Sequence, residues 1–243
     1  MISIVVPVVW GYDPFCNFLL DVVQLPIIEE VILINNNVKK TPEHDVLSHQ
    51  KVHVYNQEEN IFVNPAWNLG VSLAKNNKIC ILTDDILVDL RAFLAADRFI
   101  CKEIGLLSIG IHFDLFKAQN AQYDDVKYKN LIVSGDLKIK ASEDNPNNAG
   151  QGSLFFLHKE NWIDIPNDLK IYWGDTWQYD IQMGLGRKNY FINDCFYYSP
   201  WNVASKIGVG CEYQTTDEFK KFENREYYNE LLSSKLQELR NVR

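Results

Sequence analysis

The sequence predicts an α/β fold, a mostly parallel sheet flanked by helices and followed by a C-terminal helix. Two observations along the first 90 residues predict it. Short apolar runs rich in β-branched residues alternate with segments of helical spacing, which is the rhythm of strand–helix–strand units. The first run, residues 2–9, is mostly β-branched and apolar, as in a central parallel strand buried on both faces, whereas residues 51–55 alternate. The 243 residues, without a clear linker, suit one large domain.

In this first half the elements follow the order strand, helix, strand, strand, helix, strand. The expected strands are residues 2–9, 30–34, 51–55 and 79–83. Apolar residues at helical spacing predict helices over residues 13–25 and 64–75. Pro65 lies near the start of the second helix, where proline is favoured.

The pattern changes after Leu87, which separates two halves of one domain. The expected elements are a helix over residues 90–104, strands over 104–113, 131–139 and 153–157, a short helix or turn at 159–163, a mixed segment at 173–185 and a strand at 190–198. Residues 142–152 are a turn-rich polar loop. The C-terminal helix is expected over residues 217–243, with a capping box at Thr215 and Glu218 and one apolar stripe.

Charge and cysteine content limit the class of protein. The net charge is −8 and no block of Lys or Arg occurs, which disfavours binding to nucleic acid through a basic surface. The five cysteines are scattered without a CxxC pair, as expected for free thiols in a reducing compartment. The apolar N-terminal run is short and contains Pro7, so no transmembrane segment is predicted. These features predict a cytoplasmic protein.

The most informative feature is the pair Asp84-Asp85, which follows the apolar run 79–82. Two adjacent carboxylates at the end of a core strand repel each other and are costly to desolvate. A chain keeps such a pair where a cation or the hydroxyls of a ligand lie. A solvated turn that caps the next helix would give the same pattern.

Three other turns are expected beside this pair, because ligands bind open parallel sheets beyond the carboxyl ends of their strands. They are residues 7–10, 35–37 and 57–64. A nucleotide could lie across them with its phosphates directed to the carboxylates. Two like charges hold a diphosphate only through a divalent cation, which predicts Mn²⁺ or Mg²⁺. The asparagines at 35–37 also suit an ordinary turn.

Four segments, in order, resemble the GT-A glycosyltransferases, in particular the family 2 type. They are residues 3–8, SIVVPV, 32–36, ILINN, 64–70, NPAWNLG, and 81–85, ILTDD. They match the family's first strand, its second-strand turn, its N-x-G helix start and its DxD-like motif. The resemblance covers about residues 2–90 and implies a GT-A, Rossmann-like fold.

The resemblance also implies a reaction and a division of the chain. The reaction moves a sugar from a nucleotide-sugar donor to an acceptor hydroxyl, while a metal neutralises the departing nucleoside diphosphate. Residues 1–90 would form the nucleotide-sugar-binding half, residues 91–216 the acceptor-binding and catalytic half, and residues 217–243 the C-terminal helix. Asp85 would bind the metal. The implied donor-binding residues are Pro7, Val8, Asn35, Asn36, Asn68 and Asp84.

The family's second signature, an acid-rich segment before a helix, resembles residues 174–180, GDTWQYD. It implies that Asp175 takes the proton from the acceptor hydroxyl, so that attack inverts the configuration at the sugar. Trp173 and Trp177 would stack on the acceptor, although core packing explains them equally well. The acceptor stays open among a glycan, a lipid-linked sugar, a protein and a modified nucleobase.

Three positions depart from the family pattern. Thr83 stands where the first acid of the DxD motif would be, and Gly174 where the first acid of the second signature would be. No His follows His158, although many relatives add a late His to the metal. Water or another side chain would have to complete the metal shell, and an N-cap is the other explanation of Asp175.

Two other functions stay open. A nucleotidyltransferase would share the fold, but residues 10–14, WGYDP, lack the basic, Gly-rich loop that holds a triphosphate. A non-catalytic nucleotide-sugar or glycan-binding module fits the missing acid and the missing His. Asn68 and Gly70 also suit close packing of a helix on the sheet. Residues 142–152 are expected to order over the donor as a lid.

Overall fold

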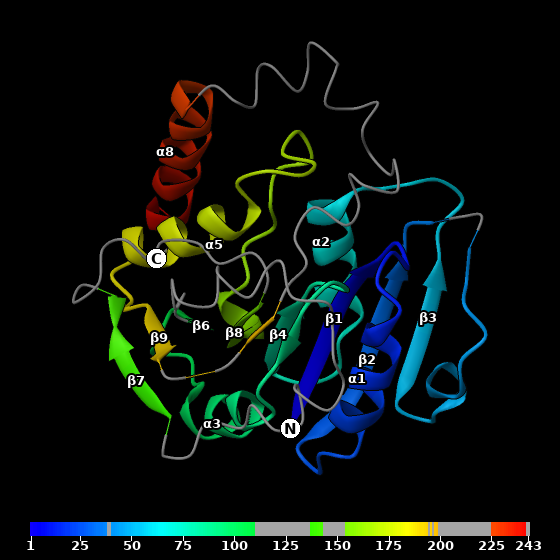
Figure 1. Ribbon diagram of the computed structural model, residues 1–243. Helices are drawn as coiled ribbons and strands as arrows, with labels where there is room; N and C mark the ends of the chain where they lie inside the picture. The colour runs from blue at the N-terminus through cyan, green and yellow to red at the C-terminus, as the bar shows by residue number, and fades with distance from the viewer. Residues whose placement is uncertain are drawn as a thin grey trace.

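The computed structural model describes residues 1–37, 40–109, 137–142, 154–193, 195, 197–198 and 225–241. In this part of the chain the main sheet has the strand order β3-β2-β1-β4-β8-β6-β9-β7 (Figure 1). Its parallel part consists of β1 (Ile2–Val8), β2 (Ile28–Asn35), β3 (Val52–Asn56) and β4 (Lys78–Leu82). The predicted α/β fold with a mostly parallel sheet is confirmed.

The other strands join this sheet in mixed directions. They are β6 (Leu106–Ile109), β7 (Lys138–Ala141), β8 (Leu154–His158) and β9 (Tyr190–Asn193). β8 is antiparallel to both β4 and β6, whereas β9 is parallel to β6. A small second sheet pairs β5 (Leu87–Val88) with β10 (Tyr197–Tyr198). The prediction of one strand over residues 190–198 is therefore wrong, because this segment leaves the main sheet after Asn193.

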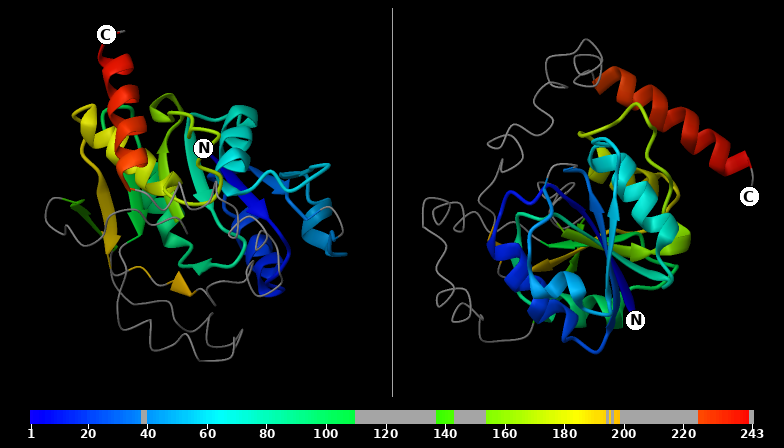
Figure 2. Two further views of the ribbon diagram at one scale, coloured as in Figure 1. Left: turned by 90° about the horizontal axis from the view of Figure 1, so that it is seen from above. Right: turned by 90° about the vertical axis from the view of Figure 1, so that its right-hand side faces the viewer.

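Helices cover both faces of the sheet (Figure 2). One face carries α1 (Pro14–Val23) and α3 (Arg91–Phe99), and the other carries α2 (Val63–Leu73), α5 (Gly174–Gly184) and α8 (Arg225–Asn241). Side chains of β1 alternate between the two cores, with Ile4 and Val6 in the first and Val5 in the second. The described residues also contain two short 3₁₀ helices, η1 (Asp45–Ser48) and η4 (Lys159–Asn161).

Several predicted boundaries are wrong. β2 begins at Ile28, two residues before the predicted start, and the predicted helix over residues 90–104 ends at Phe99. The segment predicted as mixed is one helix, α5. The predictions for residues 110–113, 131–136, 143–152 and 217–224, including the proposed lid and part of the C-terminal helix, lie outside the described residues.

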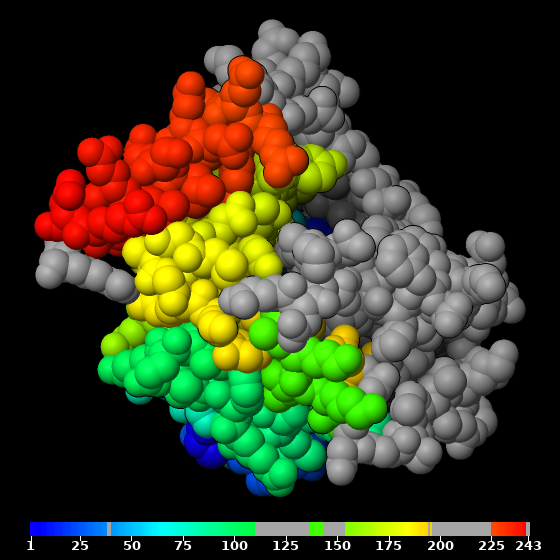
Figure 3. Space-filling model, turned by 90° about the vertical axis from the view of Figure 1, so that its left-hand side faces the viewer, coloured from blue at the N-terminus to red at the C-terminus, as the bar shows by residue number. Residues whose placement is uncertain are grey.

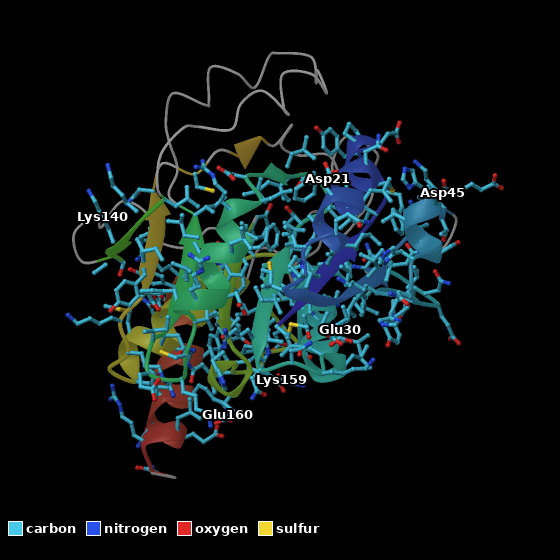
Figure 4. The ribbon with its side chains drawn as sticks, turned by 90° about the horizontal axis from the view of Figure 1, so that it is seen from below. Asp21, Glu30, Asp45, Lys140, Lys159 and Glu160 are labelled. Carbon is cyan, nitrogen blue, oxygen red and sulfur yellow. The ribbon has the colours of Figure 1, made fainter. Side chains whose placement is uncertain are left out.

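Buried polar contacts hold the end of α2 on the sheet. Glu30, on β2, is 2% exposed and accepts hydrogen bonds from the Ser3 hydroxyl at 2.7 Å and the Lys75 amide at 2.6 Å. The Lys159 ammonium donates to the carbonyl of Ala74. Both side chains, labelled in Figure 4, therefore bind the chain where α2 leads into β4, at the edge opposite the carboxyl ends of β1 to β4.

Two further expectations concern the membrane and the cysteines. No helix among the described residues is long and apolar enough to cross a membrane. Cys16, Cys80, Cys101 and Cys195 are free thiols, as expected. Cys211 lies outside the described residues.

Candidate functional site

The turns after four strands meet at one edge of the sheet. In the strand register Val8 lies beside Asn35, and Asn35 lies beside Asn56. After β4 the chain turns at Asp84 and Asp85. Hydrogen bonds between these turns confirm that they meet at the carboxyl edge of the sheet, as predicted.

Asp84 joins the end of β4 to the turn after β1. Its Oδ2 accepts hydrogen bonds from the amides of Val9 at 2.7 Å and Trp10 at 3.0 Å, and the residue is 8% exposed. The solvated helix cap, the other explanation of this acid, is wrong. The next helix, α3, is preceded instead by Asp89, whose Oδ1 accepts a hydrogen bond from the Arg91 amide at 2.9 Å.

The neighbouring acids have raised pKa values. Burial raises the pKa of the Asp84 carboxyl to about 7; the Val9 amide opposes this rise and the charge of Asp85 adds to it. Burial also raises the pKa of Asp85, against a hydrogen bond from the Thr83 side chain. A cation beside two such acids would favour their charged forms.

Trp10 and Asn35 join the turns after β1 and β2. The Trp10 indole Nε1 donates to Asn35 Oδ1 at 2.9 Å. Asn35 Nδ2 donates to Asn56 Oδ1 at 2.8 Å and to Thr41 Oγ1 at 3.1 Å. Both ends of the Asn35 amide therefore bind protein groups in this structure, and its contact with a donor stays a prediction.

Asn36, Pro7 and Val8 are also buried at this edge. Asn36 Nδ2 donates to the Phe62 carbonyl at 3.2 Å, and its Oδ1 accepts from the Ile61 amide at 3.3 Å. The Val8 carbonyl accepts from the Asn36 amide at 2.9 Å. These contacts fix the turns on which a donor would lie.

Asn68 lies one turn into α2 and binds the segment before α5. Its Nδ2 donates to the Ile165 carbonyl at 2.8 Å, and its Oδ1 accepts from the Ile165 amide at 3.0 Å and from Trp162 Nε1 at 3.3 Å. A Cβ on Gly70 would lie 2.2 Å from Val5 Cγ1. The close packing of α2 on the sheet, the structural explanation given for these two residues, is thus present at Gly70, whereas Asn68 binds the segment before α5.

Replacing Asp84 tests its anchoring role. We expect Asp84→Ala to lower the free energy of unfolding at pH 5.5 by about 2 kcal/mol, because the amides of Val9 and Trp10 lose their acceptor. Asp84→Asn keeps an acceptor oxygen and should stay within about 1 kcal/mol of the wild type. Urea unfolding measures both, and equal losses in the two variants would contradict the role.

The start of α5, which carries Asp175, is packed against the start of α2. Asn64 Nδ2 donates to the carbonyls of Leu169 at 2.7 Å and Tyr172 at 3.0 Å. A Cβ on Gly174 would lie 2.0 Å from Asn64 Oδ1. Asn64 therefore occupies the space that any side chain at position 174 would need, which is the physical reason for the missing acid.

Asp175 lies in the first turn of α5, and its Oδ1 accepts a hydrogen bond from the Thr176 amide at 2.8 Å. α2 connects the parallel strands β3 and β4, so its first residues lie at the carboxyl edge of the sheet. The contact between Asn64 and Gly174 therefore brings Asp175 to the same edge as Asp84 and Asp85.

The two predicted acceptor residues pack on protein. Trp177 is 1% exposed, and the Trp173 ring is stacked on Tyr228 of α8 with 5.0 Å between the ring centroids. Core packing therefore accounts for Trp177 in this structure. Tyr172, which precedes them, is 45% exposed.

The sequence placed Trp10 in the turn after the first strand, Asn64 in a family-like motif and Tyr228 in the last helix, but it did not predict the contacts of these three residues. Trp10 has a φ of 58°, and Phe62 and Trp173, which precede α2 and α5, have φ values of 66° and 65°. Bulky residues rarely adopt this left-handed conformation, and it is found preferentially at functional sites. No sequence signal predicts it, because the surrounding packing imposes it.

The residues at the edge fit a Mn²⁺ or Mg²⁺ ion. Asp85 is partly exposed, whereas Asp84 Oδ2 is occupied by two amides. Within the described ranges no group of three His, Cys, Asp or Glu residues could hold a metal. Mg²⁺ sites commonly use one or two carboxylates, with water and substrate phosphates as the other ligands, and the Asp85 carboxylate is compatible with such a site.

Comparison with solved structures now places the fold. The first 349 residues of S. aureus TarS, solved with UDP, match 82% of this chain with a TM-score of 0.54 and 15% identity. The mannosyltransferase PcManGT from Pyrobaculum calidifontis, with GDP-Man and Mn²⁺, matches 77% with a TM-score of 0.52 and 16% identity. GalNAc-T7, with UDP, GalNAc and Mn²⁺, matches 83% with a TM-score of 0.53 and 15% identity.

The chain has the GT-A fold. All three proteins are GT-A glycosyltransferases, so the resemblance to this fold is confirmed. The chain spans 60% of the TarS structure, 53% of PcManGT and 45% of GalNAc-T7. At these identities the likeness concerns the fold alone. No family model matches this chain, and no curated protein matches it.

Proposed function

We propose that this chain is a metal-dependent glycosyltransferase that moves a sugar from a nucleotide-sugar donor to an acceptor hydroxyl with inversion. One observation carries the proposal: Asp85 lies beside the buried, anchored Asp84 at the carboxyl edge of a GT-A sheet. GT-A structures with UDP, or with GDP-Man and Mn²⁺, superpose on the chain and support a donor of this class.

The proposed donor site follows from the contacts at the edge. Asp85 would hold Mn²⁺ or Mg²⁺, with water and donor phosphates as further ligands, and the bound cation supplies neutralisation of the leaving diphosphate. Asp84 keeps the turn after Pro7 and Val8 in place. We infer that Asn35, Asn36 and Asn68 shape the donor surface mainly by holding neighbouring chain segments in place, because their side-chain amides already bind protein groups there.

The proposed base is Asp175. Its position at the start of α5, against α2, supports this role because the acceptor hydroxyl must approach the sugar from the face opposite the diphosphate. The acceptor would lie beside Trp173 and Trp177, whose rings both contact Tyr228 in this structure. The donor half at residues 1–90 and the acceptor half at residues 91–216 are part of the same proposal.

Turnover of nucleotide sugars tests the proposal. We expect at least one UDP- or GDP-sugar to release its nucleoside diphosphate with Mn²⁺ and not with EDTA. Glycan, lipid-linked sugar, protein and nucleobase acceptors should be compared. Donor binding without turnover across all of them would favour the non-catalytic module, for which Gly174 is the motivating residue. No binding of any nucleotide sugar in Mn²⁺ would contradict the proposal.

The raised pKa of Asp84 predicts how the metal effect depends on pH. The pKa rises from 3.8 to about 7 in the folded protein. The stability that the protonated Asp84 carboxyl contributes is therefore fully present below about pH 4 and is lost as the pH rises through 7. A cation held by Asp85 would favour the charged form of the neighbouring Asp84 carboxyl. Saturating Mn²⁺ should therefore raise Tm by roughly 5 °C at pH 8 and by less than about half of that at pH 5. Equal shifts in thermal unfolding at both pH values would contradict this coupling.

A further inference from the structure

The C-terminal helix α8 lies along α5, the helix that carries Asp175 (Figure 3). Near the start of α8, the Tyr228 hydroxyl donates to Asp180 Oδ2 at 2.8 Å. Near its end, Arg240 Nη2 donates to the Gly184 carbonyl at 2.8 Å. α8 is thus hydrogen-bonded to both the middle and the end of α5.

Tyr228 also contacts the start of α5. Its ring is stacked on Trp173, with 5.0 Å between centroids and 26° between planes, and meets Trp177 edge-on at 6.3 Å. The residue is 3% exposed. Burial raises the pKa of its hydroxyl, as do Asp180 and, more weakly, the charge of Asp175. One side chain therefore touches residues on both sides of Asp175.

The first turn of α5 has little of its own to fix its orientation. Its N-cap, Trp173, is in the left-handed conformation and makes no side-chain cap hydrogen bond, and its first residue is a glycine. Glycine and a missing cap both weaken a helix start. The orientation of this turn therefore depends on tertiary contacts, with Asn64 on α2 and Tyr228 on α8.

We propose that α8 is a clamp that sets the orientation of the first turn of α5, and that Tyr228 is the positioning residue for Asp175. This inference rests on the proposed function only in the role it gives to Asp175. The contacts predict that loosening Tyr228 slows the transfer step and leaves donor and metal binding unchanged, because, among the described residues, Tyr228 contacts α5 and not the turn that carries Asp84 and Asp85.

Adjacent tyrosines offer a matched test. Tyr228→Phe removes the hydrogen bond to Asp180, and Tyr227→Phe removes a similar bond, at 2.9 Å, to Asp168 outside α5. We expect Tyr228→Phe to lower kcat about tenfold and Tyr228→Leu, which also loses the ring stack, about 100-fold. The KM for the donor should stay within about twofold in both, and Tyr227→Phe should stay within about twofold in kcat. Equal kcat in wild type and both Tyr228 variants would overturn the proposal.

Amide hydrogen exchange gives a second readout that needs no turnover. Faster exchange confined to the amides of residues 175–178 in Tyr228→Phe, with unchanged exchange in β1 and in Tyr227→Phe, supports the clamp. Unchanged exchange at these amides would overturn it. If the wild-type chain turns over no donor, the proposed function fails while the exchange result still decides the clamp. If Tyr228→Leu does not fold, Tyr228→Phe carries both readouts.

Discussion

Gly174→Ala is expected to lower the free energy of unfolding by about 2–4 kcal/mol. The new Cβ would lie 2.0 Å from Asn64 Oδ1 and 2.6 Å from its Cγ. Asn64 is fully buried and its Nδ2 binds two carbonyls, so it has no space into which to move. Denaturant unfolding of the variant gives the loss directly.

A double-mutant cycle separates this clash from other effects. In an Asn64→Ala background, which is itself destabilised by the lost hydrogen bonds, adding Gly174→Ala should cost less than about 1 kcal/mol. Gly184→Ala, at the other end of α5, is the matched control. The three atoms nearest its Cβ all belong to the Leu236 side chain, which can turn aside, and the cost should stay near 1 kcal/mol or below. An equal loss for Gly174→Ala in both backgrounds would show that Asn64 is not the cause.

The same contact bears on the candidate base. An acid at position 174 would need the space that Asn64 fills, so the family's first acid is incompatible with this packing of α2 against α5. Of positions 174 and 175, only Asp175 could therefore take the proton in the proposed transfer. We expect Gly174→Asp to fold less stably than Gly174→Ala, because it adds a buried charge to the same clash.

Asp85→Ala is expected to lower metal-dependent donor turnover by about 10³-fold, because the proposed cation loses its protein carboxylate. The fold should persist, since Asp85 is partly exposed and, unlike Asp84, is not the acceptor of the Val9 and Trp10 amides. The rise in Tm with Mn²⁺ should also disappear. Steady-state assays and thermal unfolding measure both effects.

The controls for this prediction are two substitutions that keep the shape of the replaced side chain, Asp85→Asn and Thr83→Val. Asp85→Asn keeps the shape and should lose as much activity as alanine, because an amide is a poor substitute for a carboxylate on Mn²⁺. Thr83→Val, which removes the hydroxyl beside Asp85, should have a smaller effect on turnover. Wild-type activity in Asp85→Asn at limiting Mn²⁺ would rule out Asp85 as the metal ligand.

The sequence predicted the parallel half of the fold because its signals are local. β1 is apolar except at Ser3 and β4 except at Lys78, and both strands are buried except at Lys78. The polar turns after them could be placed at one edge because parallel strands end together. The position of Asp84 and Asp85 was therefore predictable from the sequence.

Other features depend on contacts between distant residues and could not be predicted. The start of β2 was missed because the exposed, charged Glu29 separates Ile28 from the rest of the strand, whereas Ile28 is buried and pairs with Ile2 of β1. α5 was missed because it begins and ends in glycine and has no side-chain cap, and packing on α2 and α8 stabilises it instead. The hydrogen bonds from the Asn35 and Asn36 amides to neighbouring turns could not be predicted either, and donor binding by these residues stays a prediction.

The central claim is that Asp85 holds a divalent cation that binds a nucleoside diphosphate at the carboxyl edge. Calorimetric titration of UDP and GDP, in Mn²⁺ and in EDTA, into wild type and Asp85→Asn tests it most directly. We expect at least one nucleotide to bind the wild type about tenfold or more tightly with Mn²⁺ than with EDTA, and Asp85→Asn to lose this difference. Equal affinity in Mn²⁺ and EDTA, or an unchanged metal effect in Asp85→Asn, would contradict the claim.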